Sequence, residues 1–312
     1  MTSAPFDTTL PLTFLGPEGT FTETALLQVP GASDMVRVPS GNAAAALTMV
    51  RNGQAFAAML PIENSIEGGV PATLDAISKG MELRILHEVV VPVSFVLVAP
   101  AGVTLEDVKG VGTHPHAWAQ TRDWFNENLP AATHVPANST AAAAHMLVTG
   151  TDAFQAAVCA PLVAAQTGLN ILAAAIEDNL GAVTRFVLVG QPGAMPAPTG
   201  ADKTTLSIPL PKDRPGALMA LLEQFASRGV NLSRIESRPT GQFLGHYTFS
   251  VDVDGHIHDA RVADALRGLH RVSPGIRFLG SYPRADQQSP KVRSYNADVA
   301  FADAARWVDS LG

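Results

Sequence analysis

Residues 12–23, LTFLGPEGTFTE, carry the local pattern that decides the fold. Leu12–Leu15 is apolar or β-branched, which predicts a short strand, and the glycine-rich turn that follows permits close approach of the backbone. Thr20 and Glu23 stand at the spacing of a capping box, which indicates that a helix begins there. The segment therefore predicts a strand, a polar turn and a helix, the repeating unit of an α/β fold.

The same unit recurs three times further along the chain. Strands expected at 57–62, 108–112 and 133–135 each run into hydroxyl, amide or imidazole side chains before a helix-like segment. Pro71 and Pro115 are placed to open two of these helices, because proline fits the first helical turn. Ligands in open α/β sheets collect beyond the carboxyl ends of strands, and helix N-termini attract anions. These strand ends together predict a site for a small anion.

Two apolar segments, 88–100 and 172–184, are expected to connect two lobes. The predicted N-terminal domain covers residues 10–190, is α/β and two-lobed like the periplasmic binding proteins, and has its second lobe at about 92–172. A cleft between the lobes, crossed twice by the chain, follows from this arrangement. The class of solute receptors and ligand-sensing domains therefore remains open at this point.

A change of composition marks the next boundary. Residues 191–203, QPGAMPAPTGADK, replace periodic patterning with Pro, Gly and Ala and predict a linker. Residues 204–282 then follow the order βαββαβ, and residues 283–312 form a polar tail with a helix expected at 298–311. The expected strands of this second domain are 204–210, 231–237, 244–253 and 276–281, and its helices are 215–227 and 259–270.

Composition limits the kinds of partner. Charged residues make up 16% of the 312 residues, the formal net charge is -7, and no Lys/Arg stripe alternates with aromatics, so nucleic-acid binding is not expected. No signal peptide or long apolar stretch is apparent, which predicts a cytoplasmic protein. Cys159 is the only cysteine, which excludes a disulfide within the chain, and its apolar neighbours predict a buried thiol.

Cofactors and metals are not expected either. The sequence has no P-loop, and its glycines lack the full spacing of a dinucleotide-binding fingerprint. Two histidine pairs, His114 with His116 and His256 with His258, have no clustered carboxylate or cysteine beside them, so no metal is predicted.

Residues 184–186, TRF, place a hydroxyl and a guanidinium at the entrance to the apolar run 187–189. Taken alone, either side chain could lie at a solvated strand edge, whereas the converging helix N-termini favour an anion site. In a regular strand, Thr184 and Arg185 would face opposite ways. One of the two is therefore expected to lie at an irregular strand start or to serve the structure.

Taken together, these segments resemble the prephenate dehydratase family, and the C-terminal part resembles the ACT domain fused to such enzymes. The segments that carry the resemblance are GPEGTFT at 16–22, ENSIEG at 63–68, THP at 113–115, NSTA at 138–141, TRF at 184–186, RPGAL at 214–218 and NLSRIESRP at 231–239. The family's turn commonly has Ser where this chain has Thr113 and Gln where it has His116. Thr113 still provides a hydroxyl at its position, while the contact made by His116 is an open question.

The resemblance implies conversion of prephenate into phenylpyruvate, carbon dioxide and water in phenylalanine biosynthesis, without a cofactor. It implies that Thr184 donates a hydrogen bond or proton to the departing hydroxyl and that Arg185 holds a carboxylate. Glu67 and His114 are reserve candidates for acid chemistry. The implied substrate-binding residues are Thr20, Thr22, Asn64, Ser65, Glu67, Thr113, His114, Asn138, Ser139, Thr140 and Phe186.

For the ACT-like domain, the resemblance implies L-phenylalanine as effector, bound between paired domains of a homodimer or homotetramer. Pro215 at a helix start would leave backbone amides open to a ligand carboxylate. The implied effector-binding residues are Gly216, Ala217, Leu218, Asn231, Leu232, Glu236, Ser237, Arg238 and Pro239. Two alternatives stay open: arogenate as the substrate, and a two-lobed small-anion binding or sensor protein without catalysis.

Overall fold

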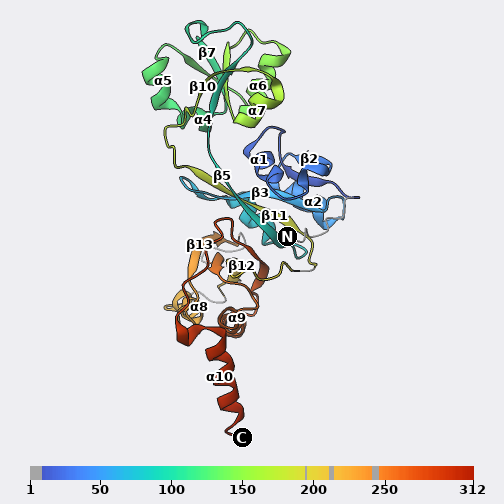
Figure 1. Ribbon diagram of the computed structural model, residues 1–312, viewed down its shortest axis with the longest axis vertical. Coiled ribbons are helices and arrows are strands. Elements are labelled where there is room, and N and C mark those ends of the chain that lie inside the picture. Colours follow the sequence, from blue (N-terminus) through green and yellow to red (C-terminus); the bar gives the residue numbers. More distant parts are fainter. Residues whose placement is uncertain (1–8, 194, 211–213, 241–245) are drawn as a thin grey trace. The chain divides into compact units, whose positions relative to one another are not determined.

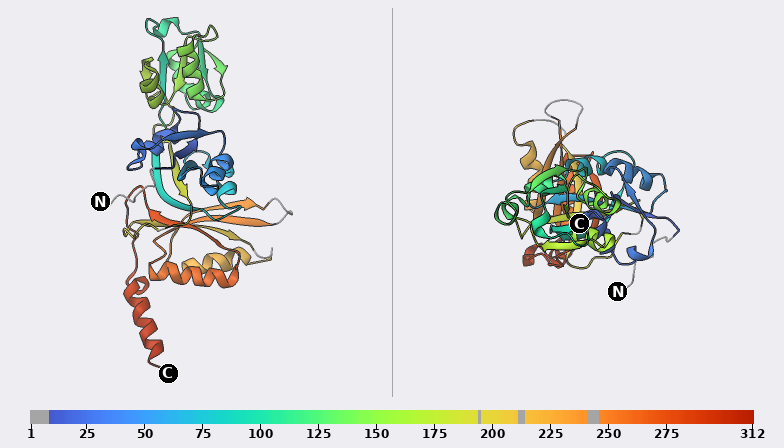
Figure 2. Two further views of the ribbon diagram at one scale, coloured as in Figure 1. Left: turned by 90° about the vertical axis from the view of Figure 1, so that its right-hand side faces the viewer. Right: turned by 90° about the horizontal axis from the view of Figure 1, so that it is seen from above.

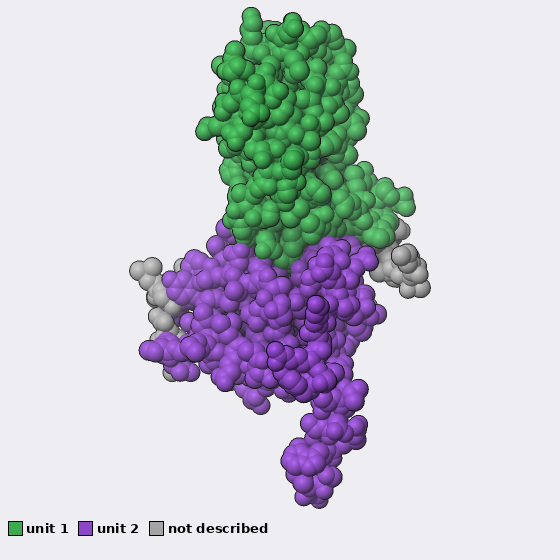
Figure 3. All heavy atoms as spheres, turned by 60° about the vertical axis from the view of Figure 1, so that its left-hand side comes forward, with its two compact units in different colours: residues 1–70, 89–186 green, residues 71–88, 187–312 purple. Residues whose placement is uncertain are grey.

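The computed structural model describes residues 9–193, 195–210, 214–240 and 246–312 (Figure 1). Contacts within the chain group it into two compact units, Met1–Val70 with Val89–Phe186 and Pro71–Glu88 with Val187–Gly312 (Figure 3). The predicted α/β fold, with a two-lobed N-terminal part followed by a βαββαβ module, is confirmed. Residues 244 and 245, where the third strand of that module was expected to begin, lie outside the described residues.

The first lobe is built on a six-stranded sheet of order β2-β1-β3-β11-β5, with β4 paired to β3. Strand β1 runs parallel to both of its neighbours, so that Leu12 lies opposite Arg37 on one side and Ala57 on the other. The elements of this lobe are β1(Leu12–Leu15), α1(Phe21–Leu27), η1(Ala32–Asp34), β2(Arg37–Ser40), α2(Ala43–Arg51), β3(Ala57–Asn64), β4(Gly68–Gly69), β5(Arg84–Pro92) and β11(Val183–Gly190).

The second lobe has a five-stranded sheet of order β10-β6-β9-β7-β8. Strand β7 is parallel to β8 and β9, whereas β6 is antiparallel to β9 and β10. At Gly112 on β7, a Cβ atom would lie 2.5 Å from the Phe154 ring, so only glycine fits there. The elements are β6(Val96–Ala99), η2(Leu105–Asp107), β7(Gly110–Thr113), α4(Pro115–Ala119), α5(Arg122–Asn128), β8(Thr133–Pro136), α6(Thr140–Thr149), β9(Ala156–Cys159), α7(Pro161–Thr167) and β10(Asn170–Ala174).

The chain crosses between the two lobes twice, as the sequence predicts, from β5 to β6 and from β10 to β11 (Figure 1). The two crossings are bonded to each other, because Glu177 Oε2 accepts from the Phe95 amide at 2.8 Å and the Val93 amide donates to the Ala182 carbonyl at 2.8 Å. Asp178, the next residue, accepts from two backbone amides at the start of α5. The polar stretch before β11 therefore fixes the backbone around the crossings.

The capping box expected at the start of α1 is not formed. Thr20 is the N-cap residue, but its side chain makes no capping hydrogen bond and its hydroxyl donates to the Pro17 carbonyl at 3.0 Å. Glu23 reaches one residue further back and accepts from the Gly19 amide at 2.6 Å. Gly19 has a φ of +79°, and a Cβ there would lie 2.6 Å from Val163 in the second lobe. Glycine is therefore required at this close approach of the two lobes.

The C-terminal module is a four-stranded sheet of order β13-β14-β12-β15, with α8 and α9 on one face (Figure 2). Strand β12 is antiparallel to both β14 and β15, and a core that includes Leu206, Leu221, Val251 and Leu269 lies between the sheet and the helices. The elements are β12(Asp202–Pro209), α8(Ala217–Ala226), β13(Leu232–Pro239), β14(Tyr247–Asp254), α9(Ala260–Val272), β15(Arg277–Pro283), η3(Ser294–Asn296) and α10(Asp298–Asp309).

Residues 71–88, which include α3(Pro71–Ile77), belong to the same unit as this module. Arg238 on β13 makes a two-pronged ion pair with Asp75 on α3, at 3.0 and 3.1 Å. Arg277 donates to two carbonyls just beyond α3, those of Ser78 and Gly80, at 2.8 and 2.7 Å. Side chains of the module therefore hold both the helix and the loop that follows it.

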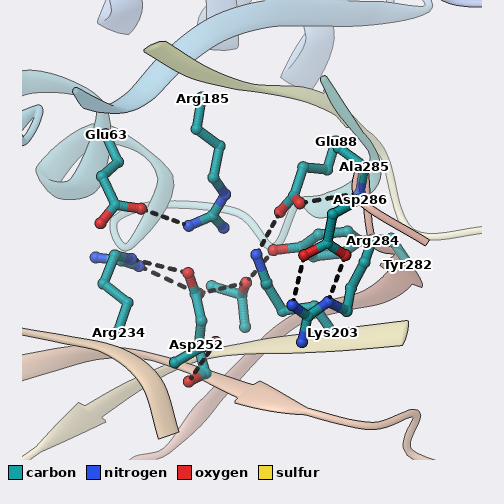
Figure 4. Close-up of polar contacts among 12 residues, drawn as sticks. Glu63, Glu88, Arg185, Lys203, Arg234, Asp252, Tyr282, Arg284, Ala285 and Asp286 are labelled. Carbon is teal, nitrogen blue, oxygen red and sulfur yellow. Dashed lines mark hydrogen bonds and ion pairs between the residues drawn. The ribbon is translucent and has the colours of Figure 1, made fainter. Parts of the chain in front are cut away.

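A buried ion pair joins the end of that segment to the module. Lys203 Nζ lies 2.8 Å from Glu88 Oε2, and the two side chains are only 10% and 4% exposed (Figure 4). The other carboxylate oxygen of Glu88 accepts from the Ala285 amide at 3.1 Å. Burying both charges is costly unless they pair and find further hydrogen bonds, and here they do. In the part of the chain that the structure describes, no helix is long and apolar enough to cross a bilayer.

Candidate active site

Asn64, at the end of β3, and Thr184, near the start of β11, meet on one face of the first sheet. Asn64 Nδ2 lies 2.9 Å from Thr184 Oγ1. The backbone holds them in place, because the Ser65 amide donates to the Val183 carbonyl and the Val183 amide donates to Ser65 Oγ, both at 2.9 Å. The two side chains are therefore positioned by paired main-chain segments that lie 118 to 120 residues apart in sequence.

The direction of this hydrogen bond follows from the other end of the amide. Asn64 Oδ1 accepts from the amides of Ile66 and Glu67, at 2.8 and 3.2 Å, so the oxygen faces the turn and the NH₂ group faces Thr184. Thr184 Oγ1 is therefore the acceptor in this bond. A hydroxyl that accepts keeps its own proton for another acceptor. The partly exposed Thr184 hydroxyl can thus donate to a ligand that lies on this face.

Arg185 and Glu63 form a second pair one residue along each strand. Arg185 Nη1 lies 2.9 Å from Glu63 Oε2 (Figure 4). The Arg185 side chain is 8% exposed and that of Glu63 is 35% exposed. Both Thr184 and Arg185 lie within β11, and successive side chains on a strand point to opposite faces. Arg185 is therefore on the face opposite to Thr184.

The second lobe contributes the turn between β7 and α4. His116 Nδ1 lies 3.1 Å from Glu67 Oε1 of the first lobe, which links the two lobes beside Asn64. His114 Nδ1 accepts from the His116 amide at 3.2 Å and so caps α4. Burial lowers the pKa of His114, and the neighbouring rings of His116 and His134 lower it further. His114 is consequently a neutral imidazole at pH 7.

Several other predicted substrate-binding side chains are engaged with nearby backbone. Thr113 is fully buried and its hydroxyl donates to the Val158 carbonyl on β9 at 2.9 Å. Ser139 is the N-cap of α6 and accepts from the Ala142 amide at 2.9 Å. These side chains therefore shape the junctions between strands and helices.

The remaining predicted residues fall into two groups. Thr22 is buried on α1 and Phe186 is 2% exposed in the core of the first sheet. Asn138 is exposed and Thr140 opens α6. Within the described residues, no group of three or more His, Cys, Asp or Glu side chains is placed to hold a metal ion.

The partners of Arg185 and His116 could not be predicted from local sequence patterns. Strands β3 and β11 are neighbours, and side chains alternate between the two faces along each strand. Asn64 pairs with Thr184 on one face, so Glu63 and Arg185, one residue along, pair on the other. The bond from His116 to Glu67 has no local signal at all. Glu23, expected only as a capping residue, has a further role: it is buried, accepts from the Gly19 amide and lies 3.7 Å from Arg37 Nε.

Comparison with known proteins identifies the family of the chain. The prephenate dehydratase family profile matches residues 12–194, more than half of the chain, and the ACT domain profile matches residues 204–271. The chain belongs to the prephenate dehydratase family. A curated prephenate dehydratase of Mycobacteroides abscessus is 46% identical over 279 residues, which cover 88% of this chain and 90% of the relative.

Two solved structures extend the comparison from sequence to fold. A prephenate dehydratase of Arthrobacter aurescens in complex with L-Phe is 63% identical, with a TM-score of 0.92, over 97% of this chain and 99% of that one. A protein described as a novel type of quorum quenching acylase is 32% identical, with a TM-score of 0.78, over 87% and 97%. The first of these similarities spans both the N-terminal part of the chain and its ACT domain.

In this member of the prephenate dehydratase family, the predicted effector residues lie at two places in the ACT domain. Gly216, with a φ of +79°, is the N-cap of α8, and the Ala217 amide donates to the Arg214 carbonyl at 3.1 Å. Leu232 and residues 236–239 lie on β13, which is an outer strand of the sheet.

Two predicted effector residues are also engaged in ion pairs or hydrogen bonds. Asn231 Nδ2 donates to Asp254 Oδ2 at 2.8 Å, and Arg238 pairs with Asp75 as described above. The Asp75 carboxylate raises the pKa of Arg238, chiefly through that hydrogen bond, so the guanidinium stays charged. Asn231 and Arg238 are therefore already partnered within the chain.

Proposed function

We propose that the chain converts prephenate into phenylpyruvate, carbon dioxide and water, with L-phenylalanine as its effector. The observation that carries the proposal is the hydrogen bond from Asn64 to Thr184, which joins two of the family's motifs and leaves the threonine proton available to a ligand. Family membership supplies the substrate class, and the geometry supplies the donor.

The reaction breaks two bonds on the substrate ring. The bond to the ring carboxylate breaks, its electron pair enters the ring, and carbon dioxide leaves. The bond to the ring hydroxyl breaks, and the oxygen leaves with that electron pair and takes up one proton to become water. The ring becomes aromatic, which provides the driving force, and no electron is exchanged with a cofactor.

Thr184 acts on the leaving oxygen. An alkyl hydroxyl is a weak acid at neutral pH, so its contribution is a hydrogen bond that strengthens as charge develops on that oxygen, and the proton of the product water comes ultimately from solvent. Asn64 fixes the direction of the hydroxyl by donating into Thr184 Oγ1. Glu67 and His116, which pair between the two lobes, lie beside the same turn.

The structure favours a different role for Arg185 than direct binding of a substrate carboxylate. Its guanidinium is buried, lies on the face opposite to Thr184 and pairs with Glu63. We assign it to holding β3 beside β11, directly beneath the bond from Asn64 to Thr184. We assign a substrate carboxylate to the first-turn amides of α6, behind Ser139, since the neutral His114 supplies no positive charge.

L-phenylalanine as effector rests on the ACT domain and on the relative solved with L-Phe. The outer position of β13 leaves one side of that strand available to a second ACT domain, which supports a homodimer or homotetramer with the effector between paired domains. Arg238 lies within the predicted effector strand and pairs with Asp75 on α3. An effector that breaks this pair would therefore release a contact that holds α3, the helix that follows the Asn64 turn in sequence. We propose the cytoplasm as the location of this activity.

One assay tests both parts of the proposal. Purified protein is supplied with prephenate, and phenylpyruvate is followed with and without L-phenylalanine, and with L-tyrosine as the control amino acid. We expect phenylpyruvate to form at a rate that changes at least several-fold with L-phenylalanine, as couplings of about 1 to 3 kcal/mol would give. Absence of phenylpyruvate overturns the catalytic proposal, and an unchanged rate overturns the effector proposal alone.

Arogenate is the alternative substrate, and the same experiment includes it. Arogenate would give phenylalanine in place of phenylpyruvate, and its amino group would favour an additional acidic contact, for which Glu67, in the turn after Asn64, is a candidate. A higher kcat/KM for arogenate than for prephenate would assign the chain to that substrate.

A further inference from the structure

Helix α10 presents an apolar stripe to solvent. Ala300, Ala304, Trp307, Val308 and Leu311 recur at helical spacing, and Leu311 lies just beyond the end of the helix. Trp307, Val308 and Leu311 are 64%, 57% and 67% exposed, and no residue of α10 is buried. An isolated helix of about 12 residues is only marginally stable in water. The stripe therefore indicates a partner that covers it.

A groove of complementary character lies on α9 of the same unit. It has a volume of about 500 Å³, and its surface is almost entirely apolar. Ala263 and Leu266 belong to one side of the helix, while Arg267 and Arg271 add positive charge. The lining residues are Ile257, Ala263, Leu266, Arg267, His270 and Arg271. The groove thus combines an apolar floor with cationic side chains.

Charge and length match between these two features. Beyond Asp298, which the Ala260 amide of the same chain holds, Asp303 and Asp309 give α10 two negative charges against the single positive charge of Arg306, whereas the groove carries two arginines and a histidine. From Ala300 to Leu311 the stripe is about 16 Å long, and the groove residues on α9 span about 12 Å, at 1.5 Å per helical residue. An acidic helix with an apolar stripe is the ligand that such a groove would select.

The groove is not filled by α10 of the same chain. The start of α10 is fixed beside the start of α9, because Asp298 accepts from the Ala260 amide at 2.9 Å. From that point the helix runs away from the layer formed by α8 and α9 (Figures 1 and 2). All its aromatic and aliphatic residues from Trp307 onward remain exposed. A second copy of the chain, by contrast, can present its own α10 to the groove.

We propose that α10 of one chain binds the α9 groove of a second copy, and that the second copy returns the same contact. A two-fold axis makes such an exchange self-complementary, so one interface buries two stripes and fills two grooves. Trp307 is the central anchor, as expected for a large aromatic side chain that enters an apolar groove. This interface is distinct from the pairing proposed for β13, and it does not depend on the reaction that the chain catalyses.

The first test uses cross-linking between chains that carry one new cysteine each. Ala304→Cys and Ala263→Cys chains are mixed and oxidised, and the native Cys159 does not interfere because it is fully buried. We expect a covalent heterodimer that exceeds either homodimer at least several-fold. If a chain carrying both cysteines gives only an internally cross-linked monomer, α10 folds back on its own groove. Either that result or a heterodimer no more abundant than the homodimers overturns the proposal.

The second test measures the mass of the full chain in solution by sedimentation. Trp307→Glu, or Arg267→Glu with Arg271→Glu, should halve the mass of the assembly, and Val36→Glu, at an exposed apolar residue of the other compact unit, should leave it unchanged. Each variant should keep the far-ultraviolet spectrum and the basal turnover of the parent. An unchanged mass for both groove and stripe variants, with folding retained, refutes the exchange.

Discussion

Replacing Asn64 by aspartate tests whether the direction of one hydrogen bond controls catalysis. Aspartate has nearly the same shape, and its carboxylate can still accept from the amides of Ile66 and Glu67, as Asn64 Oδ1 does. It cannot donate to Thr184 Oγ1 at the 2.9 Å that separates the two side chains. The threonine hydroxyl would instead donate its own proton to the introduced carboxylate, and that proton would be lost to the substrate.

The expected magnitude follows from the single donor that is removed. Loss of one hydrogen bond to a charge that develops in the transition state costs about 10² to 10³ in turnover, which is about 2.7 to 4 kcal/mol. The free energy of unfolding should change by less than about 1 kcal/mol, because the turn keeps its acceptors. Thr184→Val, which keeps the shape and removes the hydroxyl, should lose a similar factor, while Thr184→Ser should keep appreciable activity.

The assay is phenylpyruvate formation at saturating prephenate for Asn64→Asp, Thr184→Val and the double variant. The new negative charge will also repel an anionic substrate, but that effect should appear in KM and weaken with added salt, whereas the loss in kcat should not. If the two side chains act as a unit, the double variant will be no slower than the slower single variant. Near-parental kcat for Asn64→Asp, or losses that multiply in the double variant, would refute the proposed role of Asn64.

Three further predictions concern the surrounding structure. Arg185→Met should lower the free energy of unfolding by about 1 to 3 kcal/mol in urea titration, because it strands the Glu63 carboxylate beneath the site, and a stability equal to the parent would contradict the structural role of the pair. Lys203→Met should cost about 3 to 5 kcal/mol by leaving the buried Glu88 charge without this partner, whereas an unaffected unfolding midpoint would show that the charge is solvated. Burial raises the pKa of the Cys159 thiol to about 12, so at pH 8 the group stays protonated and a thiol reagent should label it only after denaturation; rapid labelling of the native protein would contradict its burial.

The sequence was informative wherever the deciding interactions are local. Apolar runs located β1, β3, β7 and β8 of the two sheets and the strands of the ACT domain, and proline placed the starts of α3 and α4. The alternation of side chains along a strand also predicted that Thr184 and Arg185 cannot share a face, and both lie in regular strand β11. These features depend on neighbours within a few residues.

Prediction was weaker where distant segments meet. The bond from His116 to Glu67 joins residues 49 positions apart in different lobes, and neither has a local pattern that names the other. The capping box at Thr20 failed because Glu23 has a competing acceptor role at Gly19, whose left-handed backbone presents its amide to that carboxylate. The pairing of Glu63 with Arg185 depends on β3 lying beside β11, which no local pattern predicts.

The membership of residues 71–88 in the C-terminal unit has a consequence for how the protein can be divided. A chain cut at the linker 191–203 would leave Asp75 without Arg238 and Glu88 without Lys203, although neither carboxylate was removed. The ACT domain therefore cannot be separated at the linker without losing these two ion pairs. An exchange of ACT domains between relatives would have to carry this earlier segment along, so two stretches separated by the whole second lobe are expected to change together.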